Sequence, residues 1–440
     1  MGHPGRARGL CRETQTAIQG LLSPEGSTMQ DIYVVGVGMT PFGKFRDKSV
    51  KDMTCEAVNA ALEDAGLAAN RIEGAFFSNA VQGHMERQHM IRGEIALREM
   101  GIQGIPVVNV ENACASASTA FKLAIDFLKA ANGDCCLAVG AEKMYSDDRA
   151  LMFSAFDSGW DVSNGEEVAQ RLADLGAGVE EPEGSKSPKP YSVFMDVYAG
   201  FARLHMKTFG TTQEQFAAVA AKNHAHSAHN PLAQYRDSMS IEQVLAAPPI
   251  SYPLTLPMCA PISDGAAAAL LCTGEGLKRL GLDPARAIKV KAAILRSGTD
   301  RPPEDFKNHL TRLAALQAYE QAGLGPEDMS VAEVHDATAV GEVIQIENLG
   351  FVEFGEGGPA SLRGETKIGG RIPVNPSGGL ESKGHPVGAT GIGQIFELVT
   401  QLRGEAGARQ VEGAQNAIAE NGGGLHGVEE ATACVTILGR

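Results

Sequence analysis

The chain has 440 residues, a formal net charge of -15 and 43% apolar residues, so it is long enough for two or more domains with a large buried core. The acidic balance argues against a nucleic-acid-binding protein, which would normally show a basic face. No segment approaches the roughly 20 consecutive apolar residues of a membrane span. We therefore expect a soluble, cytoplasmic protein without nucleic-acid or membrane partners.

Residues 1–28 differ from the sequence that follows. They combine several Arg, Gly and Pro residues with no sustained apolar period, and they lack the apolar core of a secretory signal. We interpret them as an extension ahead of a natural start at Met29, either non-native or flexible. An organelle presequence is the weaker alternative.

Strand and helix patterns alternate after residue 30. Strands bounded by turn residues and joined by helices are typical of βαβ units around a buried sheet. The sequence therefore predicts an α/β fold. The predicted strands are 31–39, 72–81, 106–110 and 135–144, and the predicted helices are 53–67 and a stretch that begins near Cys114.

An internal repeat is visible in the sequence. Residues 57–67 align without gaps on residues 314–324, with six of eleven positions identical. A strand-like segment follows each copy, and PVVNV at 106–110 has a later counterpart in IPVNP at 372–376. The shared order of elements favours duplication over a chance similarity between two Ala-rich helices.

The duplication divides the chain into an N-terminal half, about 29–275, and a C-terminal half, about 285–440, which we expect to pack face to face. An irregular insertion at about 145–255 interrupts the first half. Pro, Gly, Ser and charged residues predict a loop at its centre, 178–191, whereas its later part, 199–229, has helical patterns. Inserted segments of this kind often cover a functional site.

Eight cysteines in a chain of this length do not suggest a disulfide framework, and none has the spacing of a zinc site. We expect reduced, buried thiols and no metal or redox cofactor. Cys114 is the exception, because it stands among small residues just ahead of a long amphipathic run. At the first turn of a helix, the helix dipole and free N–H groups would favour its thiolate. The alternative is a small core residue at a crowded turn.

Two histidines and a glycine run complete the candidate site. His385 lies in a Gly-His-Pro turn before another amphipathic segment, where it can accept or return a proton near neutral pH. His335 ends a strand-like run, and a histidine there can donate to an oxyanion, with neighbouring Asp336 fixing its tautomer. The glycines of ENGGGLHG, 420–427, can present N–H groups to a second oxyanion.

Together these features resemble the thiolase superfamily over residues 30–440. NPSGGLESKGHPVGATG, 375–391, is the most specific segment, and SDGAAAALL, 263–271, is a further one. The HD pair of VHDATAV is similar to the sterol-carrier-protein-type and archaeal branches, whereas conventional thiolases carry Asn there. The resemblance implies a five-layer α-β-α-β-α fold of two βαβαβαββ-type halves.

The resemblance also implies roles for single residues. Cys114 would take the acyl group as a thioester, and His385 would activate it and help stabilise an enolate oxyanion. His335 would lie in the same oxyanion hole. The N–H groups of Cys114 and of a glycine near Gly423 would form the second hole. Coenzyme A would be a substrate, and no cofactor is implied.

The sequence departs from the family where a second cysteine is expected. Conventional thiolases have a CxG motif before the C-terminal glycines, whereas this chain has Glu420-Asn421-Gly422 there. The sterol-carrier-type branch has its cysteine directly after the HD pair, where this chain has Ala337. Three alternatives follow: Glu420 takes over as a desolvated base, His335 or His385 carries both proton transfers, or the α-proton step is not needed. Cys434 is expected in the core.

We predict a thiolase-type acyl-CoA acyltransferase (acetyl-CoA acetyltransferase-like) of lipid metabolism, which cleaves or forms the C–C bond of a 3-oxoacyl-CoA through a cysteine acyl-enzyme. The alternatives are a retro-aldolase acting on a 3-hydroxyacyl-CoA and a non-catalytic acyl-CoA-binding subunit. A homodimer or tetramer is expected by resemblance, as is a zinc-ribbon/OB-fold companion that helps to hold CoA. The sequence does not indicate which acyl group the enzyme transfers. Candidate pocket residues, which could equally cover the core, are Met144, Tyr145, Met152, Phe153, Phe156 and Trp160.

Overall fold

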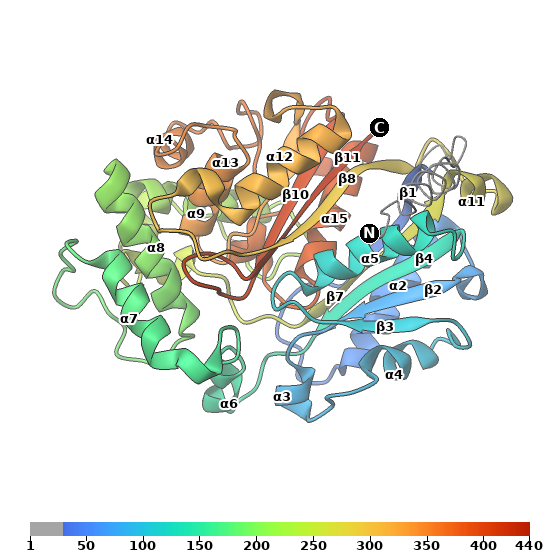
Figure 1. Cartoon of the computed structure of the whole chain (residues 1–440), viewed down its shortest axis with the longest axis horizontal. Helices are drawn as coiled ribbons and strands as arrows, with labels where there is room; N and C mark the ends of the chain where they lie inside the picture. The colour runs from blue at the N-terminus through green and yellow to red at the C-terminus, as the bar shows by residue number, and fades with distance from the viewer. Residues whose placement is uncertain (1–29) are drawn as a thin grey trace, which may run out of the picture.

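The computed structural model describes residues 30–440, so the predicted extension at residues 1–28 lies outside the described residues. Nine strands form one continuous sheet in the order β3-β2-β4-β7-β1-β8-β11-β10-β9, and helices flank it (Figure 1). Within the described part, no helix combines the length and apolar character needed to cross a membrane. The seven cysteines of this part are all free.

The sheet consists of two similar parts that meet where β1 pairs with β8. In the first, β1 and β4 are antiparallel to β7, and β2 is parallel to β4. In the second, β8 and β10 are antiparallel to β11, and β9 is parallel to β10. The N-terminal strands are β1 (Ile32–Met39), β2 (Gly74–Ser78), β3 (Val107–Val110), β4 (Cys135–Glu142) and β7 (Gly265–Thr273). The C-terminal strands are β8 (Ile288–Ser297), β9 (Val331–Glu333), β10 (Asn416–Gly423) and β11 (Thr432–Gly439).

The same pairing order in both parts confirms the predicted duplication. The fifth N-terminal strand, β3, runs parallel to β2, and its predicted counterpart at 372–376 is reduced to one parallel bridge between Ala332 and Val374. The repeated helices also end alike. Gly66 and Gly323, the shared glycine of the repeat, follow them with φ of 65° each, a left-handed conformation that glycine adopts without strain.

Five layers follow from where the helices pack. Helices α5 (Ser116–Lys129) and α15 (Thr390–Arg403) lie together in the central core between the two sheet halves. Helix α2 (Val50–Ala65) covers the outer face of the N-terminal half, and α12 (Leu310–Ala322) covers that of the C-terminal half. The α/β fold predicted from the sequence, with five layers, is therefore confirmed.

Small residues allow these layers to approach closely. A Cβ at Gly38 of β1 would lie 2.2 Å from the carbonyl oxygen of Ala57 on α2, so no side chain fits there. On its buried face, α5 carries residues three or four positions apart, including Ala117, Phe121 and Ile125, the spacing of an amphipathic helix. The remaining helices of these halves are α3 (Gln82–Glu86), α4 (Arg92–Arg98), α11 (Gly274–Arg279), α13 (Ala339–Asn348) and α14 (Gly357–Leu362).

The insertion leaves the N-terminal half after β4 and returns at β7, and it packs beside the C-terminal half (Figure 1). Its predicted central loop has no helix or strand over 178–191, and the helical patterns that follow form α8 and α9. The elements of the insertion are α6 (Arg149–Ser154), α7 (Gly165–Gly176), α8 (Phe194–Phe209), α9 (Gln213–Ser227), α10 (Ile241–Leu245), β5 (Pro249–Ser251) and β6 (Leu254–Thr255).

Candidate active site

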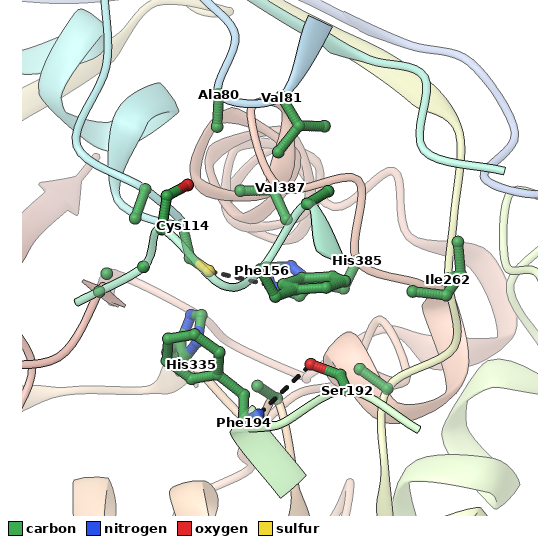
Figure 2. Close-up of a pocket in the computed structure, with 18 of the residues that line it drawn as sticks. Ala80, Val81, Cys114, Phe156, Ser192, Phe194, Ile262, His335, His385 and Val387 are labelled. Atoms are coloured by element: carbon green, nitrogen blue, oxygen red, sulfur yellow. Dashed lines mark hydrogen bonds between the residues drawn. The ribbon is translucent and has the colours of Figure 1, made fainter. Parts of the chain in front are cut away.

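A cavity of about 120 Å³ lies where both halves and the insertion meet. Cys114 comes from the N-terminal half, His335 and His385 from the C-terminal half, and Phe156 and Ser192 from the insertion (Figure 2). The structure therefore brings together the three reactive side chains that the sequence singled out. The cavity wall is mostly apolar apart from these groups, as in many small-molecule sites.

A strained turn positions Cys114 between β3 and α5. The preceding Ala113 has φ of 48°, a conformation that alanine rarely adopts. Ser116 Oγ accepts from Asn112 N–H at 2.8 Å and donates to the Ala113 carbonyl oxygen, which fixes the turn. Cys114 lies two residues before the first helical residue, Ser116, rather than within the first turn as the sequence predicted.

His385 faces Cys114 with a defined tautomer. Its Nδ1 lies 2.6 Å from Thr390 Oγ1, and the Thr390 hydroxyl donates to the Pro386 carbonyl oxygen at 3.1 Å. Since the hydroxyl hydrogen is already used, Nδ1–H must donate to Thr390. The lone pair on Nε2 is then free, and this atom lies 3.3 Å from Cys114 Sγ (Figure 2). His385 is thus oriented to accept the thiol proton.

The thiol and the imidazole are both neutral at rest. Burial raises the pKa of Cys114 to about 12, against the lowering effect of the Gly424 N–H that points at its sulfur. Burial and the neighbouring His335 and Lys383 hold the pKa of His385 well below its usual value. The thiolate expected from the helix dipole is therefore not the resting form, because desolvation outweighs the backbone N–H groups. Proton transfer to His385 has to accompany attack on a substrate.

His335 presents an N–H to the cavity. Asn421 Nδ2 donates to its Nδ1 at 3.0 Å, and the amide is oriented by Ser118 Oγ, which donates to Asn421 Oδ1 at 2.8 Å. Nδ1 is an acceptor, so the ring proton lies on Nε2. Burial lowers the pKa of His335 to about 4, so the ring is a neutral donor suited to an oxyanion.

Asp336 does not fix the His335 tautomer, contrary to the expectation from sequence. Its carboxylate accepts from the N–H of Leu380 at 2.7 Å and from Asn223 Nδ2 at 2.9 Å. The Leu380 bond ties the segment after β9 to residues 379–383, the π-helical turn just before His385, and the Asn223 bond ties it to α9. Asp336 therefore helps to hold the two histidine-bearing segments together, and Asn421 has the role the sequence gave to Asp336.

Gly423 brings β10 against the Cys114 turn. A Cβ there would lie 2.4 Å from the Asn112 carbonyl oxygen and 2.5 Å from Ala115 N. Gly423 and Gly424 both line the cavity, and it is the N–H of Gly424 that points at the sulfur. The predicted glycine contribution to an oxyanion hole stays a prediction, with Gly424 the better placed of the two beside the thiol.

Glu420 lies behind His335 rather than in the cavity. Its side chain is fully buried, and Oε2 accepts from the His335 N–H at 2.9 Å while Oε1 lies 3.5 Å from Thr311 Oγ1. Both oxygens are thus engaged, and Glu420 is absent from the residues that line the cavity. Its assignment as a base stays a prediction; its contacts support a role in positioning His335.

Sequence reasoning missed three titratable groups in the cavity wall: Glu111, Tyr198 and Glu430. Glu430 follows the glycine run by several residues, in a segment with no recognisable motif. Of the proposed pocket residues, Phe156 lines the catalytic cavity, whereas Met144 is buried in a small core cluster beside it. Tyr145, Met152 and Phe153 line a neighbouring cleft, and Trp160 lines a shallow one next to Gly424.

The neighbouring cleft, of about 620 Å³, adjoins the catalytic cavity. The two share Ser192, Met195 and the segment 260–262 as a common wall. Positive side chains in the cleft are Lys44, Arg149 and Lys189, and Asp147 is its one acidic residue. The cleft can therefore accommodate an anionic group whose far end enters the cavity.

Cys114, His335 and His385 are also a possible metal-binding group in the described part of the chain, with one ligand atom of each within 4.8 Å of the others. Cysteine sulfur and histidine nitrogen suit zinc. The same atoms carry the hydrogen bonds described above, which account for this arrangement without an ion.

The chain belongs to the thiolase family. The family of thiolase N-terminal domains matches residues 32–244, and that of thiolase C-terminal domain-like sequences matches residues 300–440. The predicted family is thus confirmed, and the chain is an acyltransferase enzyme by this membership.

Particular relatives support the predicted branch. The chain is 38% identical over 419 residues to an acetyl-CoA acetyltransferase of Methanothermobacter thermautotrophicus, which covers 94% of this chain and 100% of that protein. It is 35% identical over 412 residues to human sterol carrier protein 2, covering 90% and 70%, respectively. Among solved structures, an Ltp2-ChsH2(DUF35) aldolase superposes with a TM-score of 0.73 at 24% identity, over 93% of this chain and 97% of that chain, which shows the shared fold.

Proposed function

We propose that this enzyme cleaves or forms the C–C bond of a 3-oxoacyl-CoA through an acyl-enzyme on Cys114. The observation that carries the proposal is the Nε2 lone pair of His385 at 3.3 Å from the Cys114 sulfur. In cleavage, the sulfur attacks the 3-oxo carbon as its proton passes to His385. The bond between the 3-oxo carbon and the α-carbon then breaks, and an acyl-CoA enolate leaves.

A second CoA thiol then attacks the thioester on Cys114, and the sulfur leaves with the proton held on His385. His335 also lines the cavity, and its ring lies edge-on to that of His385, with 5.3 Å between the two ring centroids. The Nε2–H of His335 stabilises the enolate oxygen when the C–C bond breaks. Backbone N–H groups beside Cys114 stabilise the tetrahedral oxyanion that forms when a thiol attacks the acyl carbon.

CoA is proposed to lie in the neighbouring cleft with its phosphates near Lys44, Arg149 and Lys189. Its pantetheine arm would enter the cavity past the shared wall. Charge complementarity supports this placement in a protein whose net charge of -15 would otherwise repel the ligand.

Two partners are proposed. A second copy would pair at β3, one of the two terminal strands of the sheet, where Val108 is 43% exposed. Met90 and Ile91, just before α4, are 76% and 57% exposed, and exposed apolar residues at a sheet edge favour association. A zinc-ribbon/OB-fold companion that helps to hold CoA stays a proposal by family resemblance, as does a cytoplasmic location. Light scattering of purified protein, with a Val108→Lys variant, tests the first.

Thiolysis of a series of 3-oxoacyl-CoAs tests the proposed reaction. Wild type should release acyl-CoA products, and Cys114→Ala should not, with and without the companion. The competing retro-aldol reaction needs no acyl-enzyme. Full activity of Cys114→Ala on a 3-hydroxyacyl-CoA, with no thiolysis by wild type, would replace the proposal by a lyase. Binding without turnover of any thioester would indicate a non-catalytic subunit.

A further inference from the structure

Glu430 enters the catalytic cavity from the hairpin between β10 and β11. A Cβ at Gly422 would lie 2.7 Å from Glu430 Cγ, so the Glu430 side chain crosses β10 where that strand has no side chain. Residues 420 and 422 share one face of the strand. Glu430 therefore lies on the face of β10 that carries Glu420, nearer to Gly423 and the cavity, whose wall it forms together with Cys114 and His335.

The Glu430 carboxylate is held by one oxygen only. Oε1 accepts from Gln345 Nε2 at 2.8 Å, whereas Oε2 is buried without a hydrogen-bond partner. His309 Nε2 is 3.5 Å from Oε2, and since His309 Nδ1 accepts from the Thr311 N–H at 3.2 Å, its proton lies on Nε2. Oε2 is buried beside His309, so a proton passes between it and a molecule in the catalytic cavity only after the Glu430 side chain turns toward that cavity, whose wall it lines.

Among the residues described around it, no positively charged side chain forms a direct ion pair with Glu430, although the charge of Arg301 lowers its pKa somewhat. Arg301 is the neighbouring positive charge, and its Nε pairs instead with Glu429 Oε2 at 2.6 Å. Burial and the charge of Glu429 raise the pKa of Glu430 to about 7, so both protonation states are accessible near neutral pH. The titratable or charged groups that face Glu430 are Glu429, Arg301, His309, Glu420 and Tyr198.

We propose that Glu430 is the acid and base that moves the proton at the α-carbon of the acyl-CoA. The inference rests on the proposed acyltransferase reaction. It assigns to Glu430 the proton transfer that the second cysteine, which is missing from this chain, carries out in conventional thiolases. In cleavage, the electron pair of the broken C–C bond resides on the enolate, and the Glu430 carboxylic acid protonates the α-carbon. The next CoA thiol returns a proton to Glu430 as it attacks the thioester. In condensation, the Glu430 carboxylate removes the α-proton instead.

Hydrogen exchange at the α-carbon separates this step from acylation. Wild type, Glu430→Gln, Glu430→Asp and Glu420→Gln are incubated with acetyl-CoA in D2O, and deuterium in the methyl group and the acetyl adduct on Cys114 are both measured by mass spectrometry. Glu430→Gln should keep the adduct but lose exchange and C–C cleavage by about 100-fold or more, the usual contribution of a general acid or base. Glu430→Asp should recover part of the exchange.

The pH profile is the second readout. Cleavage needs protonated Glu430, so its rate should fall above about pH 7, and condensation should fall below it, following the pKa of about 7. In Glu430→Gln, the rates of both cleavage and condensation should lose this pH dependence. Exchange by Glu430→Gln equal to that of wild type would overturn the inference, and loss of exchange in Glu420→Gln alone would transfer the role to Glu420. If wild type forms no adduct on Cys114, the proposed reaction itself fails. If Glu430→Gln does not fold, the Glu430→Asp profile decides.

Discussion

The orientation of His385 depends on one hydroxyl, and Thr390→Val removes it with little change of shape. The lost bond is the 2.6 Å contact between His385 Nδ1 and Thr390 Oγ1, two buried groups of which Thr390 is the first residue of α15. An unpaired buried donor is unfavourable by about 1–3 kcal/mol. The ring can relieve this by turning or by moving its proton to Nε2, and either change removes the acceptor that faces Cys114.

If that free energy appears in the acylation barrier, the rate of Cys114 acylation should fall about 10- to 100-fold, since about 1.4 kcal/mol corresponds to a factor of ten. Rapid-quench mass spectrometry of the acyl adduct measures this step. Thr390→Ser keeps the oxygen and is the matched control, which should stay close to wild type. Equal acylation rates for Thr390→Val and wild type would refute the assigned tautomer, as would a Thr390→Ser variant as slow as Thr390→Val.

Two further predictions concern the Cys114 turn. Alkylation of substrate-free enzyme by iodoacetamide should be slow at neutral pH and accelerate continuously toward alkaline pH, because the pKa of Cys114 is raised to about 12; a rate plateau near pH 7 would show a resting thiolate. Gly423→Ala should lower the melting temperature and abolish acylation, because its Cβ would meet the Asn112 carbonyl oxygen at 2.4 Å. Gly165→Ala, where a Cβ would meet nothing within 4 Å, is the matched control and should leave both unchanged.

The fold could be predicted from local patterns because the duplication repeats them. Gly66 and Gly323 end equivalent helices, and the apolar runs of β1, β2 and β4 are long enough to identify a buried sheet. The counterpart of β3 at 372–376 was predicted as a similar segment but forms only one bridge. Strand pairing depends on neighbours that a short apolar pattern does not specify.

The three reactive residues of the site could be predicted because each stands in a recognisable local motif. Their partners could not. Asn421 on β10 orients His335, which follows the neighbouring strand β9. The sequence suggested Asp336 for this role only because Asp336 is adjacent to His335 in the chain. Glu430 reaches the cavity only because Gly422 leaves room for it on the neighbouring strand. The resting thiol is a further case, since burial depends on the assembled cavity and outweighs the N–H groups near a helix start.

The intact mass of wild type and Cys114→Ala after mixing with acetoacetyl-CoA, without free CoA, tests the central claim most directly. An acetyl-sized increase on wild type alone, mapped to the peptide that contains Cys114, is the predicted result. Two results together would contradict the acyl-enzyme. One is no mass increase on wild type, with other 3-oxoacyl-CoAs and the companion protein also tried. The other is full activity of Cys114→Ala on a 3-hydroxyacyl-CoA.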